Sequence, residues 1–189
     1  SAQATTTPGS PSPSGSAPTT PATVAPPASP DELVTSPEYE SWSRVKPGTT
    51  VEGHYVSISG TETQRIGGIR KKLVSISPES AVLDVSLSMV HDGKEVWGPA
   101  NKFTESARVP RARLYRPPPG AVITQETITV AGRTVKADVV TWKSKDSAGN
   151  EQTEQRVTSV EIPSFLCRTS TQSPTSHSAM EVVEIKLAP

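Results

Sequence analysis

The sequence predicts a mainly β protein: an antiparallel meander of about nine or ten strands, preceded by one short helix. Two observations carry this prediction. After Thr49, apolar and polar residues alternate with the period of two that half-buried strands show. Turn-forming pairs such as Asp92-Gly93 separate these segments, and no long helical pattern connects parallel strands. A meander of this size forms a curved sheet, a half-barrel, a barrel or a sandwich, and the pattern selects none of them.

The beginning of the chain has a different composition from the rest. Residues 1–30 contain no charged or aromatic residue and eight of the nineteen prolines. Such a segment buries too little apolar surface to offset the entropy lost on ordering. We therefore expect residues 1–35 to form a disordered leader or linker, and residues 36–189 to form one β-rich domain.

The same leader favours an exported protein, in the periplasm, at the cell envelope or outside the cell. Ala2-Gln3-Ala4 has the small-x-small pattern of signal cleavage sites. Ser/Thr/Pro-rich tracts are commonly spacers outside the cytoplasm. Either the end of a secretory signal or the tether of a lipoprotein fits this pattern. No apolar run approaches the ~20 residues that span a bilayer, so we expect no transmembrane segment in the given chain.

The first ordered element should be a short helix after Ser36. Ser36 can cap its first turn, and Pro37 suits the first helical position. Tyr39 and Trp42 fall on one face, where they can pack against a sheet, and Trp42 could alternatively stack on a ligand. Pro47 and the glycine after it should end the element.

The clearest strand is 81–90, in which Leu83, Val85 and Leu87 alternate with polar residues and predict one buried face. Asp92-Gly93 then predicts a type I′ hairpin to 94–98.

Other turns and strands follow from similar signals. Gly67-Gly68 predicts a hairpin, and Ala131-Gly132 predicts another. The segment 151–160 is polar on both faces, which favours an edge or solvated position. In the last strand, Val183, Ile185 and Leu187 should share a face; they alternate with Glu184 and Lys186.

Two resemblances bear on the fold. The segments PEYESWSRVKPGTTV (37–51) and ITVAGRTVKADVV (128–140) resemble uncharacterised exported proteins of environmental bacteria, which share a P-E-Y-x-x-W-x-x-x-K-P-G-T-x-V opening. The order of elements is similar to the curved half-barrel of lipoprotein-carrier (LolA-like) proteins. These resemblances imply export and a curved sheet, and neither implies catalytic residues. Relatives of the first kind have V-P-G-G where this chain has Ile162-Pro163-Ser164-Phe165.

The sequence offers little for catalysis, metals or cofactors. The three histidines are scattered singly, without the spacing of zinc ligands, and we expect no metal and no cofactor. No GxSxG motif is present, so a serine hydrolase is disfavoured. Glu126 and Asp138 could face each other across a hairpin, but opposed strand charges are usually solvated. A net charge of zero argues against a nucleic-acid partner. We expect no enzyme.

Four arginines lie close together at 108–116, a segment followed by three prolines. Arg111, Arg113 and Arg116 could bind anionic polysaccharide or lipid headgroups, because guanidinium groups pair with carboxylate, sulfate and phosphate. The alternative is a stiff connector whose arginines are solvated or paired with acids.

Cys167 is the only cysteine, so it cannot form a disulfide within the chain. In an extended strand it shares a face with Phe165 and opposes Arg168. It should therefore pack as a small apolar side chain, rather than act as a reactive thiol or bridge to another molecule.

Two functional classes remain open. The first is a non-enzymatic binding or carrier module whose concave face holds an apolar or lipid ligand. The second is a structural or protein-interaction module of the envelope with a filled core. Partners would accordingly be an apolar ligand or an envelope protein, and nothing in the sequence sets the oligomeric state. The candidate ligand-binding residues are Tyr39, Trp42, Leu83, Val85, Leu87, Arg111, Arg113 and Arg116.

Overall fold

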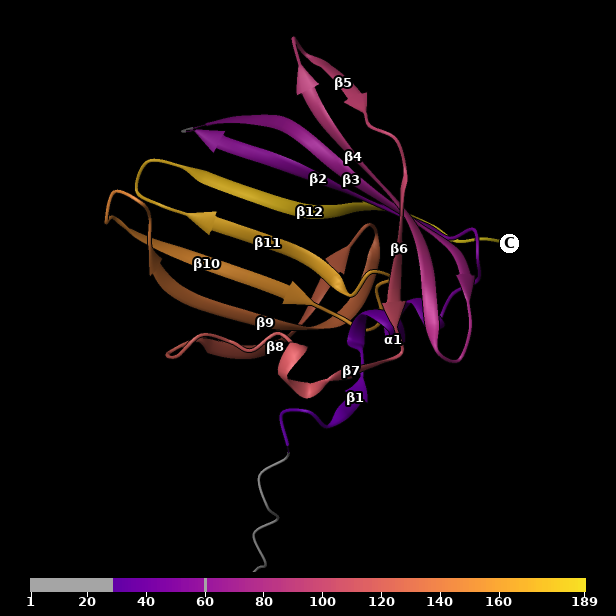
Figure 1. Ribbon diagram of the computed structural model, residues 1–189. Helices are drawn as coiled ribbons and strands as arrows, with labels where there is room; N and C mark the ends of the chain where they lie inside the picture. Colours follow the sequence, from indigo (N-terminus) through magenta and orange to yellow (C-terminus); the bar gives the residue numbers. More distant parts are fainter. Residues whose placement is uncertain (1–28, 60) are drawn as a thin grey trace, which may run out of the picture.

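The computed structural model describes residues 29–59 and 61–189. Their main sheet is an antiparallel, curved meander of ten strands in the order β5-β4-β3-β2-β12-β11-β10-β9-β8, with β6 also paired to β4. The sheet does not close: β5 and β6 lie at one edge, and β8 lies at the other (Figure 1). The predicted mainly β fold, with about ten strands and a short helix, is confirmed.

The elements are bounded as follows. In the main sheet they are β2 (Thr50–Ser59), β3 (Glu62–Ile76), β4 (Ser80–His91), β5 (Lys94–Trp97), β6 (Asn101–Ser106), β8 (Val122–Val130), β9 (Arg133–Lys145), β10 (Glu151–Thr158), β11 (Leu166–Gln172) and β12 (His177–Lys186). Outside it lie β1 (Leu33–Thr35), α1 (Pro37–Ser43), β7 (Arg108–Pro110) and the 3-10 helix η1 (Arg111–Arg113).

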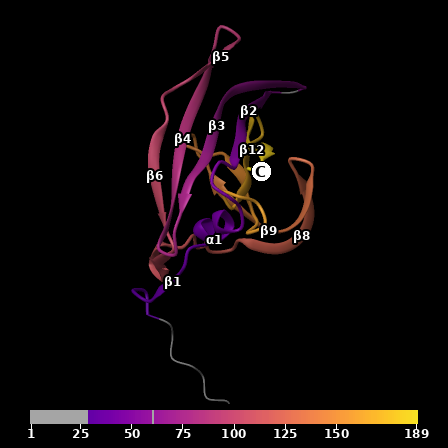
Figure 2. The ribbon, with the colours of Figure 1, turned by 90° about the vertical axis from the view of Figure 1, so that its right-hand side faces the viewer.

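Helix α1 begins as the sequence predicts. The Ser36 side chain caps it by accepting a hydrogen bond from the backbone N–H of Tyr39 at 3.3 Å, and Pro37 occupies the first turn. Trp42 is buried in the core, and the Tyr39 hydroxyl donates to the carbonyl oxygen of Ser77 at 2.7 Å. The helix packs against β3, β4 and β6, and Figure 2 shows it between these strands and the β8–β9 hairpin.

The expected disordered leader falls mainly outside the described residues, which begin at Ser29. Its last part does not fit that expectation, because Leu33–Thr35 form β1 and pair with β7. The Arg108 side chain adds a hydrogen bond to the carbonyl oxygen of Leu33 at 2.7 Å. The folded part of the chain therefore starts before Ser36.

Two of the predicted hairpins form with the expected backbone. Asp92 and Gly93 have φ angles of 49° and 71°, and Ala131 and Gly132 have φ angles of 46° and 77°. Positive φ at both central residues is the requirement of a type I′ turn, whose twist matches that of the flanking strands. These turns join β4 to β5 and β8 to β9.

The hairpin predicted at Gly67-Gly68 is wrong. β3 runs straight through both glycines, while β2 and β3 pair as far as Ser59 and Glu62 and the chain reverses there. Gly67 instead allows the backbones of β3 and β4 to approach closely, because a Cβ at this position would overlap the carbonyl oxygen of Ser88 on β4. A β-bulge between Tyr55 and Val56 lies opposite, and glycine inside a strand commonly accompanies such irregularity.

Two further strand predictions are corrected. The sequence predicts an edge or a solvated position for the segment 151–160. The edge alternative is wrong, because β10 lies inside the sheet between β9 and β11. In β12, a bulge between Val182 and Glu184 shifts the alternation of side chains. Val182 is therefore buried, whereas Val183 and Leu187 are exposed.

The core is one connected cluster of aliphatic side chains from both halves of the sheet, together with a single tryptophan and Cys167. Cys167 is fully buried, as predicted, and burial raises the pKa of its thiol to about 12. Phe165 is not its strand neighbour, because β11 begins only at Leu166. The buried members are Trp42, Val51, Leu73, Ala81, Leu83, Val130, Val135, Ala137, Val139, Val157, Ile162, Cys167 and Val182.

We predict that Gly67→Ala destabilises the protein by about 2–3 kcal/mol, because the new methyl group forces β3 away from β4. Gly98→Ala is the matched control, since its Cβ would lie 3.4 Å from the carbonyl oxygen of Leu87, an ordinary contact. Urea unfolding of both variants measures the difference. Equal stability of the two would mean that β3 and β4 are not in this register.

We also predict that Cys167 reacts slowly with a thiol reagent in the native protein and quickly in urea, because the thiol is buried and protonated at neutral pH. Cys167→Ser should lower the free energy of unfolding by about 1–3 kcal/mol, since a hydroxyl replaces the thiol in an apolar site. Fast labelling of the native protein, or an unchanged stability, would contradict this burial.

Candidate functional site

The inner face of the sheet is defined here as the face turned toward α1. Directly opposed residues of antiparallel strands share a face, so the register identifies its members. One row crosses five neighbouring strands, from β12 to β8. It consists of Met180, Thr169, Arg156, Val140 and Ile123.

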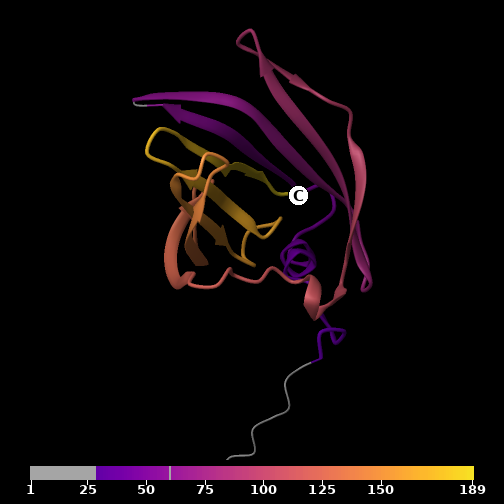
Figure 3. The ribbon, with the colours of Figure 1, turned by 60° about the vertical axis from the view of Figure 1, so that its left-hand side comes forward.

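The inner pocket is a hollow of about 420 Å³ on this face. Its floor is formed by β8, β9 and β10, and its wall by the first turn of α1 and by the connector, residues 107–121. The connector runs from the β6 side to β8 beneath α1 (Figure 3). The lining is largely apolar, with Val109, Leu114, Tyr115, Pro117, Ile123, Val140 and Phe165 among its residues.

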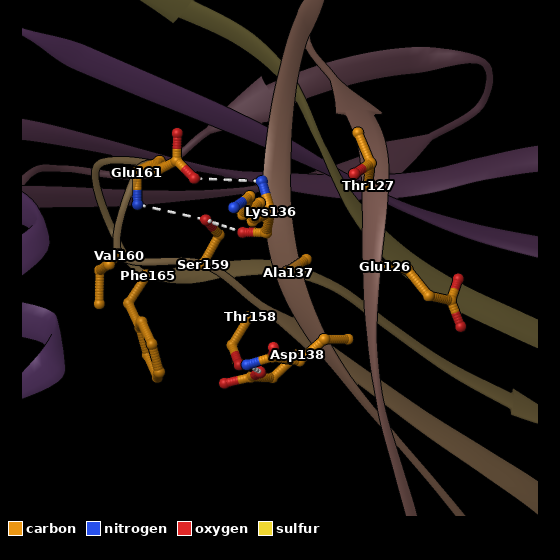
Figure 4. A pocket seen from close by; sticks show the side chains of 11 residues that line it. Glu126, Thr127, Lys136, Ala137, Asp138, Thr158, Ser159, Val160, Glu161 and Phe165 are labelled. Carbon is orange, nitrogen blue, oxygen red and sulfur yellow. Dashed lines mark hydrogen bonds between the residues drawn. The ribbon is translucent and has the colours of Figure 1, made fainter.

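A second pocket, of about 370 Å³, adjoins the first (Figure 4). Asp138, Thr158 and Phe165 line both pockets, so the two form one depression beside Phe165. The second pocket is the more polar of the two, because Lys136 and Glu161 border it.

The loop 159–165 follows β10 and forms one side of the second pocket. Hydrogen bonds fix this loop to β9. The Ser159 hydroxyl donates to the carbonyl oxygen of Lys136 at 2.6 Å and accepts from the Glu161 backbone N–H at 3.2 Å. The Lys136 backbone N–H donates to Glu161 Oε1 at 3.1 Å, which completes a small network (Figure 4). The loop thus continues the hydrogen bonding that β10 would otherwise provide.

Ser164 and Phe165 adopt backbone angles that favour glycine. Their φ values are 81° and 61°, in the left-handed region where a Cβ is strained. The second of these positions carries an aromatic ring that lines both pockets.

Arg156 is the principal cationic group of the inner pocket. Its guanidinium carbon lies 4.5 Å from the centre of the Tyr115 ring, and Tyr115 also contacts Trp142, with 6.5 Å between ring centres. The Nε atom of Arg156 is buried and has no hydrogen-bond partner among the described residues. Nor does Arg156 form an ion pair with any residue in 29–59 or 61–189.

Lys71 adds a second cation on the inner face, opposite Val85 in the register. Burial lowers the pKa of Lys71; Glu105 and Glu38 oppose this effect, and the charge of Arg156 adds to it. Conversely, burial raises the pKa of Glu105, the Glu38 carboxylate adds to that rise, and Lys71 opposes it. Both shifts disfavour the charged form, as expected for groups removed from water.

The remaining acids of the pocket have partners of their own. Glu38 accepts a hydrogen bond from the Ser36 hydroxyl at 3.3 Å, and Asp138 accepts one from the Gln125 side chain at 3.0 Å. Glu126 is opposed to Ala137, one register position from the pair Gln125–Asp138, so its carboxylate and that of Asp138 lie on opposite faces.

The apolar residues that the sequence suggested as ligand-binding candidates fall into two groups in the structure: core residues and exposed residues. Trp42 and Leu83 are core residues, each 1% exposed, and Tyr39 packs against the core. Val85 is half-buried on the same face. Leu87, two residues further along β4, is 57% exposed, so β4 leaves α1 and the core between these positions.

The arginine segment is mainly a connector. Arg111 forms an ion pair with Glu32 at 3.0 Å, and Arg116 is exposed outside the inner pocket. Arg113 does line the inner pocket, beside Tyr115. The arginines are therefore divided between the β1–β7 attachment, solvent and the pocket.

Sequence reasoning missed Arg156, Lys71 and Glu105. Arg156 stands in a segment whose two faces are equally polar, and no local pattern shows which side faces inward. Lys71 belongs to the run Arg70-Lys71-Lys72, which resembles a solvated charged stretch. A signal did exist for Lys71: it stands at an even spacing from Ile69 and Leu73, both apolar, and thus on their face.

Comparisons with known proteins add little. No family model matches the chain, and no curated protein matches it in sequence. A crystal structure from Bacteroides fragilis NCTC 9343, described as a "putative exported protein with YmcC-like fold", aligns with a TM-score of 0.47 and 8% identity. The alignment covers 75% of this chain and 97% of that chain. A likeness of this degree transfers neither a fold name nor a function.

Within residues 29–59 and 61–189, no helix combines the length and apolar character needed to cross a membrane. The same residues contain no group of three or more His, Cys, Asp or Glu side chains placed to hold a metal ion.

We predict that Lys71→Met raises the free energy of unfolding at pH 7. The pKa of Lys71 is lower in the folded protein than in the unfolded chain, so the unfolded chain binds the proton more tightly. Wild-type stability should therefore rise with pH between the folded pKa and about 10.4, the ordinary lysine pKa, and the advantage of the variant should shrink over that range. Lys72→Met is the control, because Lys72 is an exposed neighbour on the other face. A destabilised Lys71→Met at pH 7 would contradict the prediction.

Proposed function

We propose that this protein is a non-enzymatic, exported, carrier-like β-domain that binds an apolar or lipid ligand in the inner pocket. The observation that carries the proposal is the pocket itself. Its volume of about 420 Å³ falls within the roughly 300–1,000 Å³ of small-molecule sites, and its lining combines apolar side chains with a few polar groups.

The segments that cover the pocket support ligand entry. The connector and the loop 159–165 are irregular segments, whereas the core beneath α1 is covered by a helix. Leu114 and Ile123, from the connector and β8, present apolar surface to the pocket, and Ile123 is 57% exposed. An apolar ligand would remove this surface from water, which is favourable at about 25 cal/mol per Å².

A separate apolar patch lies on the inner face of β4 and β5, at the other edge of the sheet from the inner pocket. Leu87 and Met89 follow Leu83 at even spacing and are 57% and 74% exposed. Val96 is paired with Met89 and is 63% exposed. This patch offers a second apolar contact surface to a large lipid or an envelope protein.

Export remains part of the proposal and rests on the composition of residues 1–30 and the Ala2-Gln3-Ala4 pattern. An envelope location would place the domain beside lipids and lipid-bearing molecules, which are ligands of the proposed kind.

A second candidate function, a protein-interaction module, is favoured by the free edge of β8. This strand has nine residues, contains no proline, glycine or lysine, and pairs only with β9 among the described strands. Long unprotected edges can accept another strand. The opposite edge is less suitable, because it is divided into the short strands β5 and β6 with Pro99 between them.

The test is direct binding of a fluorescent fatty acid and a fluorescent phospholipid by the full chain, for which we expect roughly micromolar affinity. Ile123→Asp should weaken binding about tenfold or more, because it places a carboxylate in an apolar wall. Val122→Asp is the matched control: Val122 is 62% exposed but lies on the other face of β8. If the folded protein takes up no lipid, the carrier proposal fails and the interaction module is the better account.

A further inference from the structure

We propose that the ligand of the inner pocket carries an anionic head, a carboxylate or a phosphate, and that Arg156 binds it. This inference rests on the proposed function, because it names the chemical class of ligand for the same pocket. It depends on how the charged groups of the pocket are paired.

The geometry of Arg156 prepares it for an anion. One face of the guanidinium stacks on Tyr115 at 4.5 Å, an arrangement that fixes the group without using its N–H donors. Those donors lie in the guanidinium plane, where a carboxylate or phosphate can accept two of them at once.

Arg156 is half-buried, and the buried part of its guanidinium lacks an acceptor. Its Nε is buried without an acceptor, and no carboxylate of the described residues forms an ion pair with it. A buried donor without an acceptor costs about 1–3 kcal/mol, so native proteins seldom leave one unpaired unless a ligand or water completes it. An anionic head in the inner pocket would supply the acceptor.

The acids of the pocket do not supply it. Glu38 and Asp138 already accept hydrogen bonds from Ser36 and Gln125, and the pKa of Glu105 is raised by burial and by Glu38. Arg113, at the rim, adds a further positive charge from the connector. Glu105 has no hydrogen-bond or ion-pair partner among the described residues either, but burial raises its pKa and so disfavours its charged form. The charges left without a partner are then those of Arg156 and Arg113, which favours an anion over a cationic or neutral head.

The apolar lining determines the rest of the ligand. Val140 and then Ile123 follow Arg156 in the same inner-face row, toward β8, and Leu114 and Pro117 line the same pocket from its wall. A single acyl or alkyl chain attached to the anionic head fits this combination, with the head at Arg156 and the chain against these side chains.

Four twelve-carbon ligands separate the possibilities when their binding is measured by calorimetry with the full chain: dodecanoate, dodecyl phosphate, dodecanol and dodecylamine. We expect one or both anions to bind about ten- to a hundredfold more tightly than dodecanol. The comparison of the two anions distinguishes a carboxylate from a phosphate ligand. Tighter binding of dodecylamine would overturn the inference, since it would mean that the acids select a cationic head.

Arg156→Met removes the guanidinium but keeps much of the apolar stem. We expect it to weaken anion binding about ten- to a hundredfold and thereby to remove the preference for the anion over dodecanol. Arg116→Met is the control, because Arg116 is exposed and outside the pocket. Circular dichroism establishes whether each variant is folded. If Arg156→Met does not fold, a salt titration of anion binding by the wild type replaces it; affinity independent of salt would count against a charged contact.

The outcomes distinguish the two proposals. Equal binding of all four ligands would refute the anionic head but keep the apolar pocket of the proposed function. Absence of binding by all four would refute both.

Discussion

Ten antiparallel strands that curve without closing leave one face of their sheet to be covered by other segments. Over β3 and β4 the cover is a helix: Trp42 of α1 joins Leu73 and Leu83 in a region with almost no exposed surface. Over β8, β9 and β10 the cover is irregular chain, namely the connector 107–121 and the loop 159–165. A helix presents a continuous apolar stripe, whereas an irregular segment must also satisfy its own backbone groups. The irregular cover leaves a hollow over the inner face of β8, β9 and β10. The core residues of β9 and β10, such as Val139 and Val157, alternate with the pocket residues Val140 and Arg156 along the same strands.

The hollow side also keeps a charge that a stable core would avoid. Arg156 stands on the inner face of β10, lines the inner pocket and forms no ion pair with the described residues. The left-handed backbone at Ser164 and Phe165 adds strain at the rim of the same depression. Such features commonly lie at sites where activity limits stability. Their concentration on one half of the inner face distinguishes that half from the core.

Local turn and cap chemistry could be predicted from the sequence, but features set by a neighbouring strand could not. Asp92-Gly93 makes its turn because two residues with positive φ suffice to define it. Gly67-Gly68 has a similar appearance in the sequence, yet Gly67 is required by the backbone of Ser88 on the neighbouring strand β4. Val183 is exposed because a bulge shifts the register beside it. Arg156 reaches the pocket through pairings with β9 and β11, and no single segment contains that information.

The attachment of β1 to β7 has a mechanical consequence. Tension applied at Ser29 reaches this attachment before it reaches α1. The backbone hydrogen bonds from Ala112 to Pro30 and from Arg111 to Glu32 would bear the load first, followed by the β1–β7 ladder from the pair Leu33–Pro110. Because the force enters at that end, the residue pairs of the ladder would separate one after another, and each pair in turn would bear the whole force. The strand on the other side of this ladder belongs to the connector that walls the inner pocket. The segment that precedes α1 is therefore attached directly to the wall of the inner pocket. A force applied at Ser29 would act on that wall before it acts on the main sheet.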